Sequence, residues 1–439
     1  MATLYHCPMG RTICYRGNAM NSKTIWYCHP YAGSPNEGMS YRPYYLAKYW
    51  KKAGQKAYVI SSSFHHLLHE PKSQKETIST QEIEGVDYIR LKTTKYQKNS
   101  LHRILNMLSY AWQIRKNQKK LLQITGKPDV IIVSSSHPFH YVSLYPLAKK
   151  LHIPLIFEVR DLWPSSLIEL LNLKKWHPLV VILSLIEKHA YRHADGVVSL
   201  LAEAKPYMVS KGLKPEKFAY IPNGTDCEIA ETKKLPKVLE KTIQELKKEN
   251  QFLVGYAGAL GVPNAMEHFI KAMAIVQKTN PNIHALIVGQ GHEKKELLDY
   301  CQKHNIHNVS FFDPIPKTQV HHFLKEMDLL YLGWQDSPLY QHGVSPNKIF
   351  DYMLAGKPIL ESGGAHLSFI EQAQCGQKCP SAAPDAIAKK LIALSQLSHT
   401  TLCSLGKKAY AYVVQNYHYL NLSEQYMAFF AKNDSLDTD

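Results

Sequence analysis

The sequence of 439 residues lacks any apolar run of the roughly 18 residues that a membrane-spanning helix needs. It also lacks a signal-peptide core, because the first residues carry Arg11 and Arg16 but no apolar stretch. We therefore expect a protein that neither crosses a membrane nor is exported through a signal peptide. Residues 1–23 are expected to form a poorly structured extension.

Paired cysteines are also missing. None of the eight cysteines belongs to a Cys-x-x-Cys pair, and no histidine spacing completes a zinc site. Scattered thiols of this kind are typical of a reducing compartment. The sequence thus predicts a cytoplasmic protein that needs no metal or other cofactor.

Arginine is absent after Arg192, so every cation in the second half of the chain is a lysine or a histidine. Residues 251–407 hold thirteen lysines and twelve acids, although the whole chain has a net charge of +16. The positive charge gathers instead in residues 90–127, which hold ten lysines or arginines and no acid.

Within this basic segment, residues 101–123 predict an amphipathic helix that contains Trp112. Basic amphipathic helices bind anionic membrane surfaces. Nucleic acid is the other polyanion to consider, but the chain has no helix-turn-helix or RNA-binding motif. The apolar face could also simply pack on a sheet, which is compatible with membrane contact.

Strands and helices alternate along two stretches of about 200 residues each, which predicts an α/β protein with two doubly wound parallel-sheet domains. The expected parts are a first domain over 24–226, a linker with a surface helix over 227–250, a second domain over 251–404, and a helix over 405–432 that packs back across the domains. The first strand, 24–29, runs into a loop with Gly33 and Gly38. That loop is either an ordinary turn or a place where a ligand approaches the backbone.

Polar residues follow two buried strands of the first domain. His137 comes directly after the strand 129–136, and the strand that begins at Pro154 ends in Glu158, Arg160 and Asp161. Ligands of parallel α/β sheets bind at the carboxyl ends of the strands. A structural pair between arginine and a carboxylate and a substrate clamp both fit the three charges.

In the second domain, the segments 252–261 and 284–291 each join a strand to a turn with two glycines: Gly258 and Gly261 in the first, Gly289 and Gly291 in the second. Two such turns within forty residues indicate a nucleotide pocket, although isolated glycine pairs are frequent without one.

Residues 343–358 predict one short helix, with Ser345 as N-cap, Pro346 at the first helical position and Gly356 as its left-handed end. Its apolar side holds Ile349, Phe350, Met353 and Leu354.

The polar side of this helix holds Asn347, Lys348 and Asp351. A lysine in the first turn is electrostatically unfavourable, because the N-terminus of a helix carries partial positive charge. A bound anion would remove this conflict. Taken alone, the stretch fits a solvated lysine and a phosphate site equally well.

Together, the motifs resemble the retaining nucleotide-sugar glycosyltransferases of family 4, especially those that build bacterial surface polysaccharides. The resemblance runs from about residue 25 to 417 and rests on the glycine-containing first loop, Ser-Ser-Ser-His-Pro-Phe at 134–139, Phe-Glu-Val-Arg-Asp-Leu-Trp-Pro at 157–164, Ile-Pro-Asn-Gly-Thr-Asp at 221–226, Tyr-Ala-Gly-Ala-Leu-Gly at 256–261, Val-Gly-Gln-Gly at 288–291 and Ser-Pro-Asn-Lys-Ile-Phe-Asp-Tyr-Met-Leu-Ala-Gly-Lys-Pro at 345–358. It implies the GT-B fold, in which two Rossmann-like domains face a central cleft.

The resemblance also implies roles for single residues. His137 would line the acceptor and sugar side, and the helix over 343–358 would direct its N-terminus at the donor diphosphate. The candidate catalytic residues are His137, Asp161, Lys348 and Asp351. The candidate donor-binding residues are Gly33, Gly38, Arg160, Asn223, Gly258, Gly261, Gly289, Gly291, Ser345, Pro346, Asn347, Lys348 and Asp351.

The sequence departs from the family pattern at two places. Many members carry two acids eight residues apart, but here Gly343 stands at the first position and Asp351 at the second. Many also carry an arginine and a lysine after the Tyr-x-Gly strand, where this chain has residues 262–265 without a charge. Lys348 is then the best remaining cation for the diphosphate.

The expected activity is transfer of a sugar, with retention of configuration, from a nucleotide diphosphate-sugar such as a UDP-sugar to a lipid-linked saccharide. The enzyme would act as a peripheral protein on the inner face of the cytoplasmic membrane, with no nucleic-acid partner. Alternatives are another GT-B enzyme, such as a nucleotide-sugar 2-epimerase, and a non-catalytic GT-B scaffold.

Overall fold

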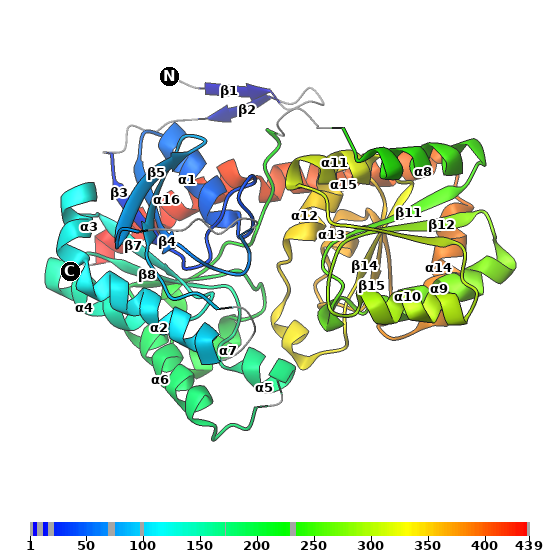
Figure 1. The fold of residues 1–439 in the computed structure, drawn as a ribbon. Helices are drawn as coiled ribbons and strands as arrows, with labels where there is room; N and C mark the ends of the chain where they lie inside the picture. Colours follow the sequence, from blue (N-terminus) through cyan, green and yellow to red (C-terminus); the bar gives the residue numbers. More distant parts are fainter. Residues whose placement is uncertain are drawn as a thin grey trace. The chain divides into compact units, whose positions relative to one another are not determined.

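The computed structural model describes residues 3–6, 12–15, 22–68, 75–96, 101–171, 173–228 and 234–436 (Figure 1). The chain divides into two compact units, one formed by 1–226 with 419–439 and the other by 227–418. Each unit is built on its own largely parallel sheet with helices around it. The predicted α/β class with two parallel-sheet domains is confirmed.

The first unit contains an eight-stranded sheet in the order β10-β9-β8-β7-β3-β4-β6-β5. Its strands are β3 (Thr24–Cys28), β4 (Lys56–Ser62), β5 (Ile78–Ile83), β6 (Val86–Leu91), β7 (Val130–Ser134), β8 (Leu155–Val159), β9 (Gly196–Ser199) and β10 (Phe218–Tyr220). All neighbours are parallel except β5 and β6. The central strands β7 and β8 are buried at every position, which explains why they are apolar apart from Ser134 in β7 and Glu158 in β8.

The helices of the first unit are α1 (Arg42–Lys52), α2 (Leu101–Lys116), α3 (Gln118–Thr125), α4 (Tyr141–Leu151), α5 (Ser165–Leu171), α6 (Pro178–His193), α7 (Lys205–Ser210), the 3-10 turn η1 (Pro215–Lys217) and α16 (Tyr419–Leu436). The single basic helix predicted over 101–123 is wrong in one respect, because Asn117 leaves the helical conformation and separates α2 from α3. The face of α2 that packs into the unit holds Met107, Tyr110 and Ile114.

A buried ion pair joins α1 to the end of β8. The Arg42 Nε lies 2.8 Å from Glu158 Oε2, and neither side chain is exposed to solvent. Arg42 also donates to the carbonyl oxygens of Ile221 and Pro222. Burial raises the pKa of the Glu158 carboxyl, but the charges of Arg42 and Arg160 and the hydrogen bonds from Ser134 and Tyr426 more than offset this and hold its pKa below the ordinary value.

The last helix, α16, packs on α1 and belongs to the first unit. Its Tyr426 hydroxyl donates to Glu158, and Trp50 of α1 donates to the Ser423 carbonyl. The single helix predicted over 405–432 is therefore wrong. His418 is extended, which ends one helix at Tyr417, and the N–H of Tyr419 donates to the Thr225 carbonyl of the first unit.

The second unit contains a six-stranded, fully parallel sheet in the order β13-β12-β11-β14-β15-β16. Its strands are β11 (Phe252–Ala257), β12 (Ile283–Val288), β13 (Val309–Phe312), β14 (Leu329–Gly333), β15 (Ile359–Ser362) and β16 (Gly376–Cys379). Its helices are α8 (Lys237–Lys248), η2 (Val262–Asn264), α9 (Met266–Thr279), α10 (Lys294–Lys303), α11 (Lys317–Lys325), η3 (Pro338–His342), α12 (Asn347–Leu354), α13 (Phe369–Ala373), α14 (Pro384–Ser395) and α15 (His399–Tyr417).

The extension over 1–23, which was expected to be poorly structured, contains two short strands. Within 1–23, β1 (Thr3–His6) and β2 (Thr12–Tyr15) pair in antiparallel register. Within 227–250, where a linker with a surface helix was expected, the structure has α8, which buries Leu239 and Ile243. Residues 229–233 lie outside the described residues. Among the helices of the described part, none combines the length and the apolarity that a membrane span requires.

We expect replacement of Arg42 by methionine to lower the free energy of unfolding by about 3–5 kcal/mol, because it leaves the Glu158 carboxylate buried without its partner. Urea unfolding measures the change. The control is Lys51→Met, which removes an ion pair between Lys51 and Asp87 that is partly exposed and should cost less than about 1 kcal/mol. Equal losses in the two variants would contradict the role assigned to the buried pair.

Candidate functional site

The strand order of the first unit reverses between β3 and β7, so the loops after these two strands meet at the carboxyl edge of the sheet. His137 follows β7, and its ring lies 5.6 Å from the ring of Tyr31, which follows β3. The rings of Phe139 and His140 also lie within 6 Å of the His137 ring. The structure thus brings the predicted His137 to the switch point of the sheet.

His137 is only 1% exposed, and neither of its ring nitrogens has a hydrogen-bond partner. Burial, His140 and Arg103 lower the pKa of His137 well below its ordinary value. The imidazole is therefore neutral at physiological pH, with one nitrogen able to donate a hydrogen bond and the other able to accept one.

Arg160 and Asp161 follow β8, which pairs with β7, so they lie at the same edge as His137. Glu158 pairs with Arg42 and not with Arg160, and no carboxylate among the described residues forms an ion pair with Arg160. The Nη1 of Arg160 is buried without a hydrogen-bond partner, while Asp161 is exposed. Arg160 thus has one nitrogen without a partner, although its charge also favours the ionised forms of the Glu158 and Asp161 carboxyls.

The loop after β3 needs its glycines for its own packing. A Cβ on Gly33 would lie 1.9 Å from the Gly38 carbonyl oxygen, and Gly38 has a φ of +122°. The structure therefore explains both residues as parts of a tight turn and gives no separate evidence that they bind a ligand.

Asn223, the remaining predicted residue of this unit, is buried in the loop after β10. The two preceding carbonyls, of Ile221 and Pro222, accept hydrogen bonds from Arg42. The loop that carries Asn223 is thus held by the buried ion pair.

In the second unit, the glycine-containing turns after β11 and β12 pack directly on each other. A Cβ on Gly289 would lie 1.9 Å from the Gly258 carbonyl oxygen, and a Cβ on Gly291 would lie 1.8 Å from the Leu260 carbonyl oxygen. These two glycines are required for backbone packing. Gly258 and Gly261 face side chains instead, and the Lys348 amine would lie 3.6 Å from a Cβ on Gly258.

The helix predicted over 343–358 is α12, and its apolar face is buried as expected, including Ile349 and Met353. Its start was predicted wrongly. Pro346 is extended, with ψ at 142°, and is itself the N-cap, so Ser345 lies outside the helix and Asn347 is the first helical residue. No side chain caps this end, whereas Gly356, with φ at +67°, ends the helix as predicted.

Lys348 lies in the uncapped first turn of α12. Its Nζ donates to the Tyr256 hydroxyl at 3.1 Å and to Asn264 Oδ1, and it lies 4.8 Å from the centre of the Tyr256 ring. All these partners are neutral. Burial lowers the pKa of the Lys348 amine to about 7, so the protein holds a cation here at a cost that an anion would remove.

Asp351, one turn further along α12, is paired with Lys317 of α11. Both side chains are about one-fifth exposed. The second unit thus brings Lys348 and Asp351 to one side of α12, next to the turn that holds Gly258.

One buried acid was not identified from the sequence. Glu187 of α6 accepts hydrogen bonds from Tyr191 and Tyr207, and burial raises its pKa to about 7. It lines a crevice that is too narrow for a water molecule, together with Asp161 and Trp163. Its position on the otherwise apolar buried face of α6, with Leu183 and Ala190, is the pattern that could have revealed it.

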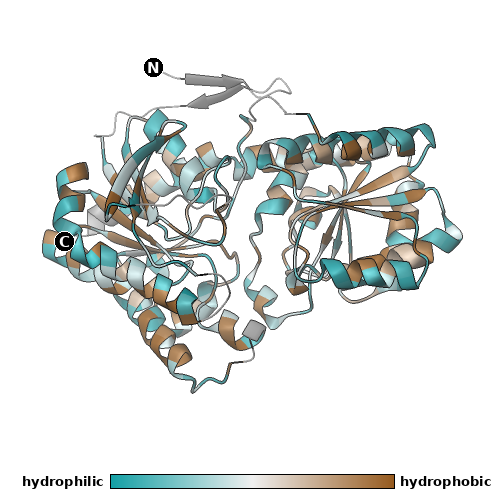
Figure 2. Ribbon diagram, in the orientation of Figure 1, coloured by the Kyte–Doolittle hydropathy of each residue, from teal (hydrophilic) through white to brown (hydrophobic). Residues whose placement is uncertain are grey.

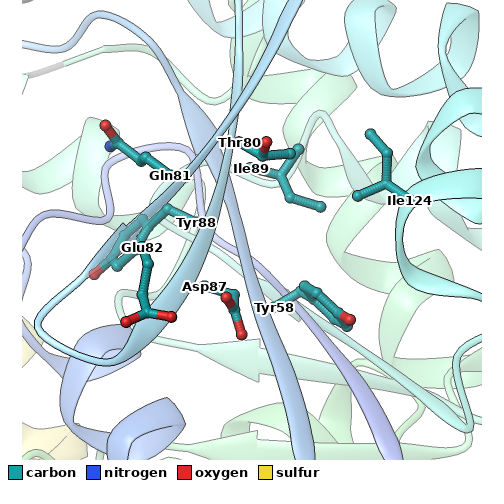
Figure 3. A pocket seen from close by; sticks show the side chains of 8 residues that line it. All are labelled: Tyr58, Thr80, Gln81, Glu82, Asp87, Tyr88, Ile89 and Ile124. Atoms are coloured by element: carbon teal, nitrogen blue, oxygen red, sulfur yellow. The ribbon is translucent and has the colours of Figure 1, made fainter.

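A separate pocket of about 300 Å³ lies on the edge of the first sheet and contains none of the predicted site residues (Figure 3). It is lined by Tyr58, Thr80, Gln81, Glu82, Asp87, Tyr88, Ile89 and Ile124. Its Asp87 is already paired with Lys51.

Among the described residues, no three His, Cys, Asp or Glu side chains lie together as they would around a metal ion.

Two family models match the chain. One, described as Glycosyltransferase Family 4, matches residues 37–229, and the other, described as Glycosyl transferases group 1, matches residues 239–411. No curated protein matches by sequence.

Several solved structures share the fold. Anabaena Alr3699/HepE, in complex with UDP and glucose, is 15% identical over 93% of this chain and 100% of its own, with a TM-score of 0.63. Sucrose-phosphate synthase from Thermosynechococcus elongatus is also 15% identical, over 94% and 100%, with a TM-score of 0.73. WaaG, a glycosyltransferase involved in lipopolysaccharide biosynthesis, is 15% identical over 91% and 98%, with a TM-score of 0.62.

The lowered pKa of Lys348 can be tested by acetylation at a series of pH values, with mass spectrometry to quantify each lysine. The neutral amine reacts, so Lys348 should reach half of its maximal reactivity near pH 7, because burial disfavours its ammonium form. The exposed Lys303 of the same unit serves as the internal reference. A Lys348 that reacts only above about pH 9 would contradict a burial-lowered pKa.

Proposed function

We propose that this chain, a glycosyltransferase with the GT-B fold, moves a sugar from a UDP-sugar to a lipid-linked saccharide of surface polysaccharide biosynthesis. Configuration at the sugar C1 is retained, and the reaction takes place at the inner face of the cytoplasmic membrane. The observation that carries this proposal is Lys348, a basic amine held by neutral partners in the uncapped first turn of α12.

Transfer requires the C1–oxygen bond to break and the diphosphate to leave with its negative charge. The N–H groups at the start of α12 and the Lys348 ammonium are fixed donors that stabilise such a charge without reorganisation. Diphosphate binding also gives the Lys348 ammonium the counter-charge that the protein itself does not supply. Asp351 and its partner Lys317 lie one turn away, where Asp351 takes the ribose hydroxyls.

On the first unit, neutral His137 accepts or donates a hydrogen bond to the sugar or acceptor, and Arg160 and Asp161 border the same edge. The acceptor hydroxyl attacks C1 from the side of the leaving group, and its proton passes to a diphosphate oxygen. No protein nucleophile and no metal is needed in this scheme.

Structures with the same fold support the choice of donor and pathway. HepE is known with UDP and glucose, and WaaG acts in lipopolysaccharide biosynthesis. Sucrose-phosphate synthase shares the fold as well, so the fold does not identify the acceptor. The lipid-linked acceptor is inferred instead from the basic residues that could bind a membrane.

The membrane side of the proposal rests on the basic residues Arg115, Lys116, Lys119 and Lys120, which are all exposed at the end of α2 and along α3. Exposed cations of this kind are attracted by the anionic lipids of a cytoplasmic leaflet. The described residues of 101–127 contain no acid that would oppose this attraction.

Replacing Lys348 by alanine should slow sugar transfer about 100- to 1,000-fold, which is the usual effect of removing one preorganised donor to a developing charge. Transfer from a labelled UDP-sugar to a lipid-linked saccharide measures this. The matched control is Lys303→Ala, an exposed lysine that should leave the rate unchanged. Transfer by Lys348→Ala near the wild-type rate would overturn the diphosphate role.

Neutralising Arg115, Lys116, Lys119 and Lys120 together should reduce binding to anionic vesicles at least about 100-fold, since each cation near such a surface contributes about 1 kcal/mol. Co-sedimentation with phosphatidylglycerol vesicles measures the loss. The exposed lysines of α8, such as Lys241 and Lys248, provide the control set. Unchanged sedimentation after neutralisation would contradict the membrane assignment.

A further inference from the structure

Three neighbouring helices of the first unit expose large apolar side chains. Helix α4 packs against both α2 and α6, so the three form one continuous layer (Figure 1). We call their exposed apolar residues, with the tryptophan just before α6, the apolar rim. It consists of Leu101, Leu105, Leu108 and Trp112 of α2, Val142 of α4, and Trp176, Val181, Ile182 and Leu185 at α6.

The exposure of these side chains is large. Leu101 is 77% exposed, Trp176 72% and Leu185 63%, and Figure 2 shows hydrophobic segments along α6. Single exposed apolar residues are ordinary, but a contiguous apolar surface on a globular protein usually marks an interaction site.

The rim lies at the same edge of the sheet as the candidate acceptor residues. Helices of a parallel α/β sheet run opposite to the strands, so their first turns lie at the carboxyl edge. Val142 lies in the first turn of α4, five residues after His137. Below the rim, Met107 of α2 and Leu183 of α6 share one buried cluster with Tyr31, which contacts the His137 ring.

Positive charge lies beyond the apolar part on each of the three helices. The exposed cations near the C-terminal ends are Arg115 and Lys116 of α2, Lys149 and Lys150 of α4, and Lys188 and Arg192 of α6; among them, Lys149 is paired with Asp195. The three helices contain a single acid, Glu187, and it is buried. The layer therefore presents an apolar rim followed by a basic band, with no exposed negative charge.

We propose that the apolar rim inserts into the acyl region of an anionic bilayer while the basic band binds the lipid headgroups. This rests on the proposed function for the identity of the acceptor and extends the membrane contact from α2 and α3 to α4 and α6. Insertion holds the carboxyl edge of the first sheet, with His137, at the level where a lipid-linked saccharide leaves the bilayer. Trp176, with the Lys174 ammonium 5.1 Å from its ring centre, suits the interface between water and lipid.

A bilayer fits this surface better than a second copy of the chain. Two copies that joined through the rim would bring their basic bands together, and like charges placed face to face are destabilising. Anionic lipids supply the opposite charge for the band and an apolar layer for the rim.

Quenching of tryptophan fluorescence by lipids with brominated acyl chains tests insertion of the α6 end. Trp112 and Trp176 belong to the rim, whereas Trp26 and Trp50 are fully buried. In vesicles that contain phosphatidylglycerol, Trp176→Phe and Trp112→Phe should each lose part of the quenching, and the double variant most of it. Quenching of Trp176→Phe equal to that of the wild type would limit insertion to α2 and overturn the proposal.

A double variant, Ile182→Asn with Leu185→Asn, should bind these vesicles at least about tenfold more weakly, because two inserted apolar side chains become polar. The matched control is Val238→Asn, at an apolar residue that is 72% exposed on α8 of the second unit. UDP binding in solution, unchanged in both variants, verifies that they are folded. Equal vesicle binding of the two variants would contradict the proposal, as would a wild-type dimer that the double variant abolishes.

Failure of the rim and failure of the proposed function have different outcomes. If the protein inserts as expected but transfers no sugar from any UDP-sugar, the membrane role of the apolar rim is supported and the assigned activity is wrong. If it transfers sugar but the α6 variants bind vesicles as the wild type does, the assigned activity is supported and the proposed insertion of the apolar rim is wrong.

Discussion

The first unit depends on the buried ion pair between Arg42 and Glu158. Both charges are fully removed from solvent, and such a pair is tolerated only when every remaining donor and acceptor is satisfied. Tyr27, Ser134 and Tyr426 donate to the carboxylate, and the carbonyls after β10 accept from the guanidinium. One interaction thereby joins β3, β7, β8, α1, α16 and the loop after β10. It also holds the end of β8 in place, and Arg160 and Asp161 come directly after this fixed end.

The second unit has the opposite electrostatic arrangement at its candidate site. Two glycine-containing turns pack backbone against backbone, and the Lys348 amine is held beside them by a phenol and an amide. The first unit pairs the buried charges of Arg42 and Glu158 with each other, whereas the described residues of the second unit give the Lys348 amine only neutral partners. This contrast supports a structural role for Arg42 and is the reason why we propose Lys348 as a ligand-binding residue, although both are basic residues in helices.

The sequence predicted those features that depend on local periodicity and on burial. The central strands β7 and β8 are apolar except at Ser134 and Glu158, because helices cover both faces of a parallel sheet. The 3.6-residue period placed Ile349 and Met353 on the buried face of α12. The start of α12 could not be derived, because the φ of proline fits both an N-cap and a first helical residue, and only its ψ decides between them. The break at His418 depends on a bond from Tyr419 to Thr225, far away in the sequence.

The sequence could not predict which side chains of the site contact one another. Glu158 and Arg160 are two residues apart, yet the partner of Glu158 is Arg42, 116 positions away. Gly289 and Gly291 belong to a recognisable motif, but their contacts with Gly258 and Leu260 show a packing reason for each. The residue types at the carboxyl ends of the strands were therefore informative, while their division into structural and ligand-binding roles required the fold.

The most direct test of the account is a crystal structure of the protein with UDP or a UDP-sugar. The account predicts that the diphosphate lies at the first turn of α12, with a phosphate oxygen within hydrogen-bond distance of Lys348 Nζ and of the N–H groups that begin the helix. A diphosphate bound elsewhere, with Lys348 still held only by Tyr256 and Asn264, would contradict it.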